Sequence, residues 1–244
     1  MGPFPDGVYR AQFPYYYRNP EGMPQEAALD YYLNSIKDVF EQCGPADSIA
    51  AIVVEPLQGE GGFIPAPIEW VKAVRKICDE NGILLVADEV QTGFCRTGRM
   101  FATQYWEEAG VQPDILATAK FIAAALKTIE IMERDDLAGC SCEIGEKVSK
   151  RFNEWKEKYP VIGDVRGLGG MIGLEFVKDQ ESKEPYPEFS AAVISGCAKK
   201  GLMIEGAGTY GNVIRFLAPL VMTDEQLEAG LDIYESVIKE LLEK

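Results

Sequence analysis

The first half of the chain alternates between helical spacing and short, continuous apolar runs. Residues 25–43 and 67–80 carry apolar side chains three and four positions apart, which predicts two amphipathic helices, and a short helix is expected over residues 103–108. Residues 49–54, 83–88 and 115–119 are instead short apolar runs, which are typical of buried strands. Because these strands alternate with helices, we expect a parallel sheet with helices packed against it, an α/β arrangement.

The second half of the chain mixes helices and strands in a different order. Its pattern predicts helices over residues 122–136, 144–158, 188–200 and 224–243, and strands within residues 161–177, 201–205 and 213–217. Thr223 stands where it would cap the last helix. We therefore expect a parallel-sheet domain over residues 1–122, followed by an α+β domain over residues 123–244.

Net charge and hydropathy exclude several functional classes. The chain of 244 residues has a formal net charge of −15, so no basic surface for nucleic acid is expected. Its apolar runs are all shorter than the roughly 18 residues of a membrane span, and residues 1–10 lack the pattern of a signal peptide. We expect a cytoplasmic protein that binds neither nucleic acid nor membrane.

The absence of histidine restricts the chemistry further. It excludes nucleophilic triads that depend on histidine and zinc sites ligated by it. The six cysteines are too sparse for a disulfide framework, and no metal site is expected. Proton transfer must therefore depend on lysine, carboxylate, tyrosine or a cofactor.

Ionisable side chains stand at the ends of the three predicted parallel strands. Glu55 follows the first strand, Asp88 ends the second and Lys120 follows the third. Sites in such sheets lie at the carboxyl ends of the strands. An acid and an amine in these positions suit pyridoxal 5'-phosphate (PLP). The amine would bind the cofactor aldehyde as a Schiff base, and the acid would keep the ring nitrogen protonated.

Each of these residues also has a structural interpretation. Asp88 could cap a loop, Lys120 could be a solvated lysine, and Glu55 could be a turn residue before Pro56. A carboxylate that ends a buried apolar run needs a cationic partner, however, and a pyridinium is one. We therefore favour the cofactor interpretation for Asp88.

Five segments, in this order, resemble the class III (ω-amino acid type) PLP-dependent aminotransferases, and most closely the 4-aminobutyrate aminotransferase group. They are Ile52–Gly62, Leu85–Phe94, Pro113–Lys120, Val165–Gly169 and Ile214–Leu220. The resemblance implies the PLP-dependent transferase fold of the aspartate aminotransferase type. It would comprise a partial parallel-sheet large domain and an α+β C-terminal domain. It also implies a homodimer.

The resemblance assigns four residues to the cofactor. Asp88 would pair with the pyridine nitrogen, Val90 would pack on one face of the ring, and Gln91 would hydrogen-bond its phenolic oxygen. Lys120 would form the Schiff base and then move the proton during catalysis.

The resemblance assigns two further residues to the substrate. Arg215 would bind the α-carboxylate of glutamate or 2-oxoglutarate, because its planar fork of donors suits a carboxylate. Glu55 would pair with Arg215 when the bound substrate lacks that carboxylate.

The chain departs from the family pattern in two places. The long portion that precedes residues 2–18 in the family is absent, and with it the turn that binds the PLP phosphate. After Lys120 the sequence passes almost directly to Ala123, so a second block of the family pattern is missing.

Three functions follow from this pattern. The first is transamination of an ω-amino acid such as 4-aminobutyrate, with 2-oxoglutarate as acceptor. The second is a catalytically incomplete fragment or dimerising scaffold of the family that does not hold PLP. The third is racemase, aminomutase or decarboxylase chemistry on the same fold. The predicted pairing of Arg215 with either a substrate carboxylate or Glu55 argues against this third function, because it suits two alternating substrates.

Overall fold

The computed structural model describes residues 6–119 and 125–243, and its contacts divide the chain into two compact units. The first unit comprises Met1–Val54, Ala66–Asp88 and Thr103–Ala117. The second comprises Glu55–Pro65, Glu89–Ala102 and Thr118–Lys244. Two segments that precede residue 122 thus group with the C-terminal part, while the predicted domain boundary itself stays a prediction.

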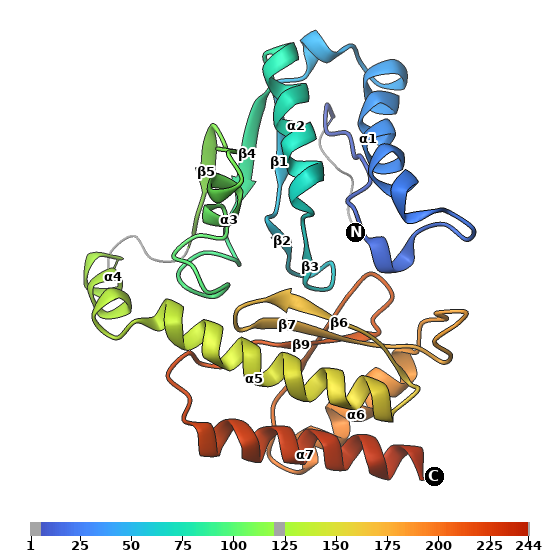
Figure 1. Ribbon diagram of the computed structural model, residues 1–244, viewed down its shortest axis with the longest axis vertical. Helices are drawn as coiled ribbons and strands as arrows, with labels where there is room; N and C mark the ends of the chain where they lie inside the picture. The colour runs from blue at the N-terminus through green and yellow to red at the C-terminus, as the bar shows by residue number, and fades with distance from the viewer. Residues whose placement is uncertain (1–5, 120–124, 244) are drawn as a thin grey trace. The chain divides into compact units, whose positions relative to one another are not determined.

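The first unit contains the predicted parallel sheet (Figure 1). Its strands lie in the order β1–β4–β5, and both pairs are parallel. Its helices are α1, α2 and α3. The bounds are α1 Gln25–Gln42, β1 Ala51–Val54, α2 Ile68–Asn81, β4 Leu84–Asp88, α3 Gln104–Glu108 and β5 Ile115–Ala117. Every one of these elements falls within a predicted range or at its edge, so this part of the prediction is confirmed.

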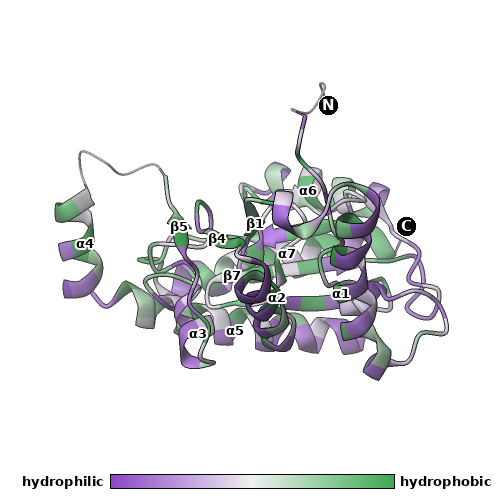
Figure 2. Cartoon of the chain, turned by 90° about the horizontal axis from the view of Figure 1, so that it is seen from above, coloured by the Kyte–Doolittle hydropathy of each residue, from purple (hydrophilic) through white to green (hydrophobic). Residues whose placement is uncertain are grey.

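Local sequence explains how these helices begin and end. In Figure 2, α1 and α2 carry both hydrophilic and hydrophobic residues, as amphipathic helices do. Helix α2 ends at Gly82, whose φ of 67° is a left-handed conformation that glycine adopts without steric cost. This sharp stop turns the chain directly into β4.

One face of the parallel sheet is buried and the other is not. Leu85 and Ala87 are fully buried and belong to a core with residues of α1, α2 and α3. Val53 and Leu84, on the opposite face, are 65% and 45% exposed. The prediction of buried strands therefore holds for one face of the sheet only, because the described helices of the first unit cover that face.

The second unit is built on an antiparallel sheet of order β6–β7–β9–β8. It also contains a short hairpin of β2 and β3. The bounds are β2 Leu57–Gln58, β3 Ile64–Pro65, α4 Ala125–Arg134, α5 Leu137–Lys158, β6 Ile162–Leu168, β7 Met171–Phe176, α6 Pro187–Lys199, β8 Glu205–Ala207, β9 Val213–Phe216 and α7 Asp224–Leu242. The predicted α+β pattern is confirmed, and the β2–β3 hairpin was not predicted.

Aromatic rings fill the core of the second unit. Phe152 and Trp155 of α5 lie against Tyr234 of α7, with ring centroids 5.7 and 5.3 Å from that tyrosine. All three side chains are at most 2% exposed. Aromatic contacts of this kind add to the free energy of burying the rings, so they fix α5 against α7.

The start of α5 differs from the prediction. The sequence pattern placed it at residue 144, whereas the helix begins at Leu137. Asp136 has a φ of 45°, and its carboxylate accepts a hydrogen bond from the Gly139 N–H. This local cap separates α4 from α5 and was not read from the apolar periodicity.

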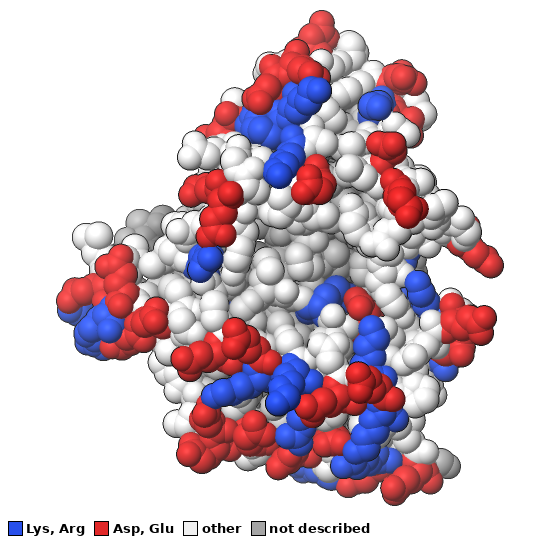
Figure 3. Space-filling view, in the orientation of Figure 1, with Lys and Arg blue, Asp and Glu red and all other residues white. Residues whose placement is uncertain are grey.

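Ion pairs connect α5 and α7 on the surface, where acidic and basic side chains alternate in Figure 3. Arg151 contacts Glu228, Asp232 and Glu235 at 3.0, 2.6 and 3.3 Å. Lys158 contacts Glu235 at 2.9 Å.

Each helix within residues 6–119 and 125–243 is either too short or too polar to span a lipid bilayer.

The cap of α7 gives a direct test of helix stability. The Thr223 hydroxyl accepts a hydrogen bond from the Gln226 N–H, and the Gln226 side chain accepts one from the Thr223 N–H. We expect Thr223→Ala to lower the free energy of unfolding by about 1 kcal/mol in urea titrations. Thr223→Ser retains the oxygen and should cost much less. Equal losses in the two variants would contradict this account.

The carboxylate of Glu235 gives a pH-dependent prediction. Burial would raise its pKa, but hydrogen bonds from Lys158, Tyr159, Lys239 and Arg151 outweigh burial and lower that pKa to about 2. The folded-state pKa lies below the unfolded value. The stabilisation is therefore present above about pH 4.5 and is lost as the pH falls toward 2.

We therefore expect Glu235→Gln to destabilise the protein by roughly 2–3 kcal/mol near neutral pH, and by progressively less below pH 4.5. Urea unfolding at several pH values measures this difference. Glu157→Gln, at an exposed position of α5, is the control. A pH-independent cost of Glu235→Gln would refute the linkage.

Candidate active site

Asp88 occupies the position that the sequence predicts for it. It is the last residue of β4, is partly buried, and lies opposite Ala117 of β5. Because β1, β4 and β5 run parallel, their carboxyl ends lie at the same edge of the sheet. Lys120, which follows β5, lies outside the described residues, so its predicted role stays a prediction.

Val90 and Gln91 follow Asp88 in a loop that belongs to the second unit. This loop is organised by Glu89, whose side chain is completely buried. The Glu89 carboxylate accepts hydrogen bonds from the Thr92 hydroxyl at 2.5 Å and from the Ala102 N–H at 3.1 Å. Sequence reasoning missed Glu89, although a second acid directly after Asp88 was a signal. Its contacts fix the backbone from which Val90 and Gln91 project.

The glycine-rich turn at residues 59–62 is held from both of its ends. The Glu55 carboxylate accepts a hydrogen bond from the Gly59 N–H at 2.9 Å. The Gly59 carbonyl accepts one from the Gly62 N–H at 3.0 Å, which closes the turn. Gly62 has a φ of 120°, a conformation that residues with side chains rarely adopt.

Arg166 holds the same turn from the sheet. Its Nε donates to the Gly62 carbonyl at 2.9 Å, and its Nη1 contacts Asp164 and Glu175 at 2.8 and 2.7 Å. The Arg166 side chain is 9% exposed and that of Glu175 only 1%. The charge of Arg166 is therefore neutralised by carboxylates inside the second unit, and its contact with Gly62 stabilises the turn against β6.

Arg215 of β9 lies between two carboxylates. It contacts Glu60 of the glycine-rich turn at 2.5 Å and Glu205 of β8 at 2.6 Å. Burial opposes protonation, but the hydrogen bonds with Glu60 and Glu205 raise the pKa of Arg215 above its ordinary value. The Arg215 side chain is 16% exposed, whereas those of Glu60 and Glu205 are 78% and 70% exposed. The guanidinium is thus fixed, and its partners face solvent.

The structure adds two carboxylates to the sequence interpretation of Arg215. Glu55 was expected to pair with Arg215 when a bound substrate lacks the α-carboxylate, and that role stays a prediction; in the structure Arg215 pairs with Glu60 and Glu205. The reason is the turn, which carries the chain away from the end of β1 and brings Glu60 to β9. Glu60 was missed because its partner is 155 positions away in the sequence.

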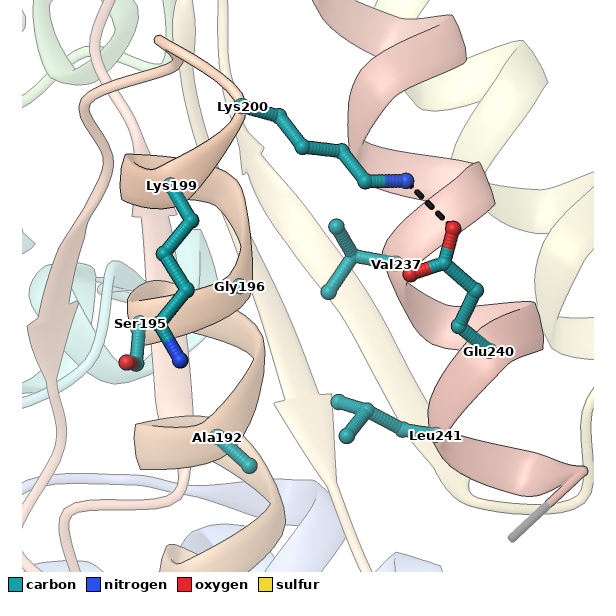
Figure 4. Close-up of a pocket in the computed structure, with 8 residues that line it drawn as sticks. All are labelled: Ala192, Ser195, Gly196, Lys199, Lys200, Val237, Glu240 and Leu241. Atoms are coloured by element: carbon teal, nitrogen blue, oxygen red, sulfur yellow. Dashed lines mark hydrogen bonds and ion pairs between the residues drawn. The ribbon is translucent and has the colours of Figure 1, made fainter.

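A separate groove lies between α6 and α7 (Figure 4) and has a volume of about 300 Å³. Val237 and Leu241 extend from α7 toward α6, and Lys200 contacts Glu240 at its rim. None of the predicted site residues lines it. Among the described residues, no group of three or more cysteine, aspartate or glutamate side chains is arranged to hold a metal ion.

The buried charge pair of Arg166 gives a prediction for stability. We expect Arg166→Met to lower the free energy of unfolding by roughly 3–5 kcal/mol, because it removes the cation beside the buried Glu175 carboxylate. Arg166→Met combined with Glu175→Gln should recover part of this loss in urea titrations. Arg134→Met, which removes an exposed pair with Asp135, is the control and should change little. A similar cost for the two single variants would contradict this assignment.

Comparison with known proteins identifies what this arrangement is similar to. The model of the family described as aminotransferase class-III matches residues 1–126 and 121–238. A probable 4-aminobutyrate aminotransferase of Bacillus subtilis is 37% identical over 98% of this chain and 62% of its own length. An alanine/serine racemase of Pyrococcus horikoshii is 34% identical over 98% of this chain and 58% of its own length.

Solved structures agree with these relatives. An (S)-enantioselective ω-transaminase from Thermomicrobium roseum superposes with a TM-score of 0.85 and 26% identity, covering 99% of this chain and 62% of that one. The predicted α/β fold of PLP-dependent transferases is therefore confirmed. The chain spans about three fifths of the length of the relatives that it matches.

The comparisons also bear on the predicted interruption near Lys120. The family model matches in two stretches that meet at residues 121–126. The alignment with the Bacillus subtilis relative runs over 274 residues, which exceeds the 244 residues of this chain. Residues of the relative therefore have no counterpart here, and the family pattern breaks where the sequence predicts it.

Proposed function

Because the chain belongs to the class III aminotransferase family, we propose that it catalyses PLP-dependent transamination of an ω-amino acid such as 4-aminobutyrate, with 2-oxoglutarate as the amino acceptor. The observation that carries the proposal is the Arg215 guanidinium, which is largely covered and held by two exposed carboxylates. The name of the Bacillus subtilis relative supports the choice of amino donor.

The chemistry of the described residues suits the ring of PLP. The Gln91 amide has no hydrogen-bond partner among the described residues, so it is available to the phenolic oxygen of the ring. Asp88 would hold the proton at the ring nitrogen, and Val90, which is 38% exposed, would pack on a face of the ring. Lys120 would bind the cofactor aldehyde. When bound, PLP supplies an electron sink for negative charge at the substrate carbon that bears the amino group.

Arg215 would bind the α-carboxylate of glutamate or 2-oxoglutarate through two parallel N–H donors. Glu60 is the carboxylate best placed to make way, because it stands in a turn between Gly59 and Gly61. Glu205 is opposite Arg215 in the β8–β9 register and is thus fixed by the sheet. Glu60 would return to Arg215 when the substrate has no α-carboxylate, so that the guanidinium keeps two carboxylate partners throughout the cycle.

Proton transfer falls to Lys120 in this proposal. Its amine would take the proton from the donor carbon that bears the amino group in one half-reaction, and deliver a proton to the Cα of the acceptor in the other. The two half-reactions exchange an amino group for a carbonyl oxygen between the donor and the acceptor, so the cycle needs no external oxidant. We also propose that the protein works as a cytoplasmic homodimer.

Two other functions are supported by particular observations. The chain spans only 62% of the Bacillus subtilis relative, which favours a catalytically incomplete fragment or dimerising scaffold. The Pyrococcus horikoshii relative is named an alanine/serine racemase, which favours chemistry on a single amino acid. A carboxylate that competes for Arg215 suits two alternating substrates better than one, and for this reason we place transamination first.

Cofactor loading tests the proposal directly. We expect added PLP to give a visible absorption band different from that of free PLP, and borohydride reduction to attach the label to Lys120. Lys127, which lies in α4 and pairs with Glu130, is the internal control because it is exposed and should remain unlabelled. Absence of the band, or label spread over surface lysines, would favour the incomplete fragment.

The proposed exchange of Glu60 for a substrate carboxylate at Arg215 is tested by kinetics with 4-aminobutyrate and 2-oxoglutarate. We expect Glu60→Gln to lower the KM for 2-oxoglutarate by about 2–5-fold, because an exposed competing ion pair is worth up to about 1 kcal/mol. Arg215→Lys should raise that KM about tenfold or more. Glu55→Gln is the matched comparison and should leave it unchanged. If Glu55→Gln lowers the KM and Glu60→Gln does not, Glu55 is the carboxylate that competes with the substrate for Arg215.

A further inference from the structure

Gly59 is buried in the glycine-rich turn at a place where no side chain fits. A Cβ added there would coincide with the Gln91 amide oxygen and lie 2.6 Å from the Gln91 Cδ. Real Cβ atoms do not approach other heavy atoms so closely. Gly59 is not among the residues with positive φ. The requirement for glycine is therefore one of space.

Neither partner in this contact can retreat through its backbone. The Gly59 N–H donates to the Glu55 carboxylate at 2.9 Å, and the Gly59 carbonyl accepts from the Gly62 N–H at 3.0 Å. The loop of Gln91 is closed on the buried Glu89 carboxylate. A methyl group at position 59 would thus displace the flexible end of the Gln91 side chain, while the fold is kept.

The contact also orients the amide. The position of a Cβ on Gly59 is nearest to the Gln91 oxygen, whereas the Gln91 Nε2 is 3.4 Å away. The oxygen thus lies where a side chain on Gly59 would begin. The Nε2 group remains as the donor that a phenolic oxygen needs.

We propose that Gly59 is a positioning residue for Gln91: its bare Cα seats the Gln91 amide with Nε2 turned toward the cofactor's phenolic oxygen. The hydrogen bond from Gln91 to the cofactor rests on the proposed function. The dependence of the Gln91 amide on Gly59 concerns the chain alone.

The first experiment needs no cofactor. In the ¹⁵N-labelled chain, the side-chain amide signals of Gln91 are identified by their loss in Gln91→Ala. We expect Gly59→Ala to shift these signals while the melting temperature stays within a few degrees. Gly230→Ala, in α7, is the matched control, because its nearest neighbour would be Leu202 Cδ1 at 3.6 Å. Unchanged Gln91 signals in Gly59→Ala would overturn the proposal.

The second experiment adds PLP in a double-mutant cycle. We expect Gly59→Ala to weaken PLP binding about tenfold and to shift the absorption band of the bound cofactor. Gly59→Ala should have no further effect on a chain that already carries Gln91→Ala. Additive effects would overturn the proposal, since Gly59 would then act independently of Gln91. If the unmodified chain binds no PLP, the proposed function fails, and the amide signals alone still decide the role of Gly59.

Discussion

Arg166 carries a positive charge into the second unit, where its side chain is only 9% exposed. A buried guanidinium is costly unless carboxylates and carbonyl oxygens surround it, and here Asp164, Glu175 and the Gly62 carbonyl do so. The contact with Gly62 ties the glycine-rich turn to β6. The turn in turn carries Glu60 to Arg215 and presents Gly59 to Gln91.

The two arginines of this unit show how burial of the partner decides what a charge does. Arg166 pairs with Glu175, which is 1% exposed. Displacing either group would leave the other as a buried charge with neither that counter-ion nor water around it. Arg215 pairs with two carboxylates that are at least 70% exposed, so replacing one by a substrate carboxylate exposes nothing that was buried. The first arrangement suits a structural pair and the second suits exchange of partners.

The turn also shows why small residues are concentrated beside the candidate site. Gly62 is required by its backbone conformation, whereas Gly59 is required by the space that the Gln91 amide occupies. Glu60 stands between them and is 78% exposed. One short segment therefore combines three features: Gly62, which Arg166 holds; Gly59, against which the Gln91 amide packs; and Glu60, whose carboxylate is exposed.

Sequence by itself determined most of the helices and strands, and the position of Asp88 at the end of one of the strands. Helical spacing and apolar runs depend on neighbours within about a turn or a strand, so α1, α2, β4 and α7 could be predicted from local patterns. Asp88 could be predicted because it directly ends such a run. The start of α5 could not, because a cap by Asp136 breaks the helix without changing the apolar spacing.

Only the tertiary structure decided which groups meet. The pairing of Glu60 with Arg215 depends on a turn that reverses the chain and on a strand far away in the sequence. The packing of Gln91 against Gly59 joins residues 32 positions apart, and no periodicity reports it. Local pattern fixes which residues are helical or extended, but contacts between distant segments depend on how buried charge and volume are accommodated together.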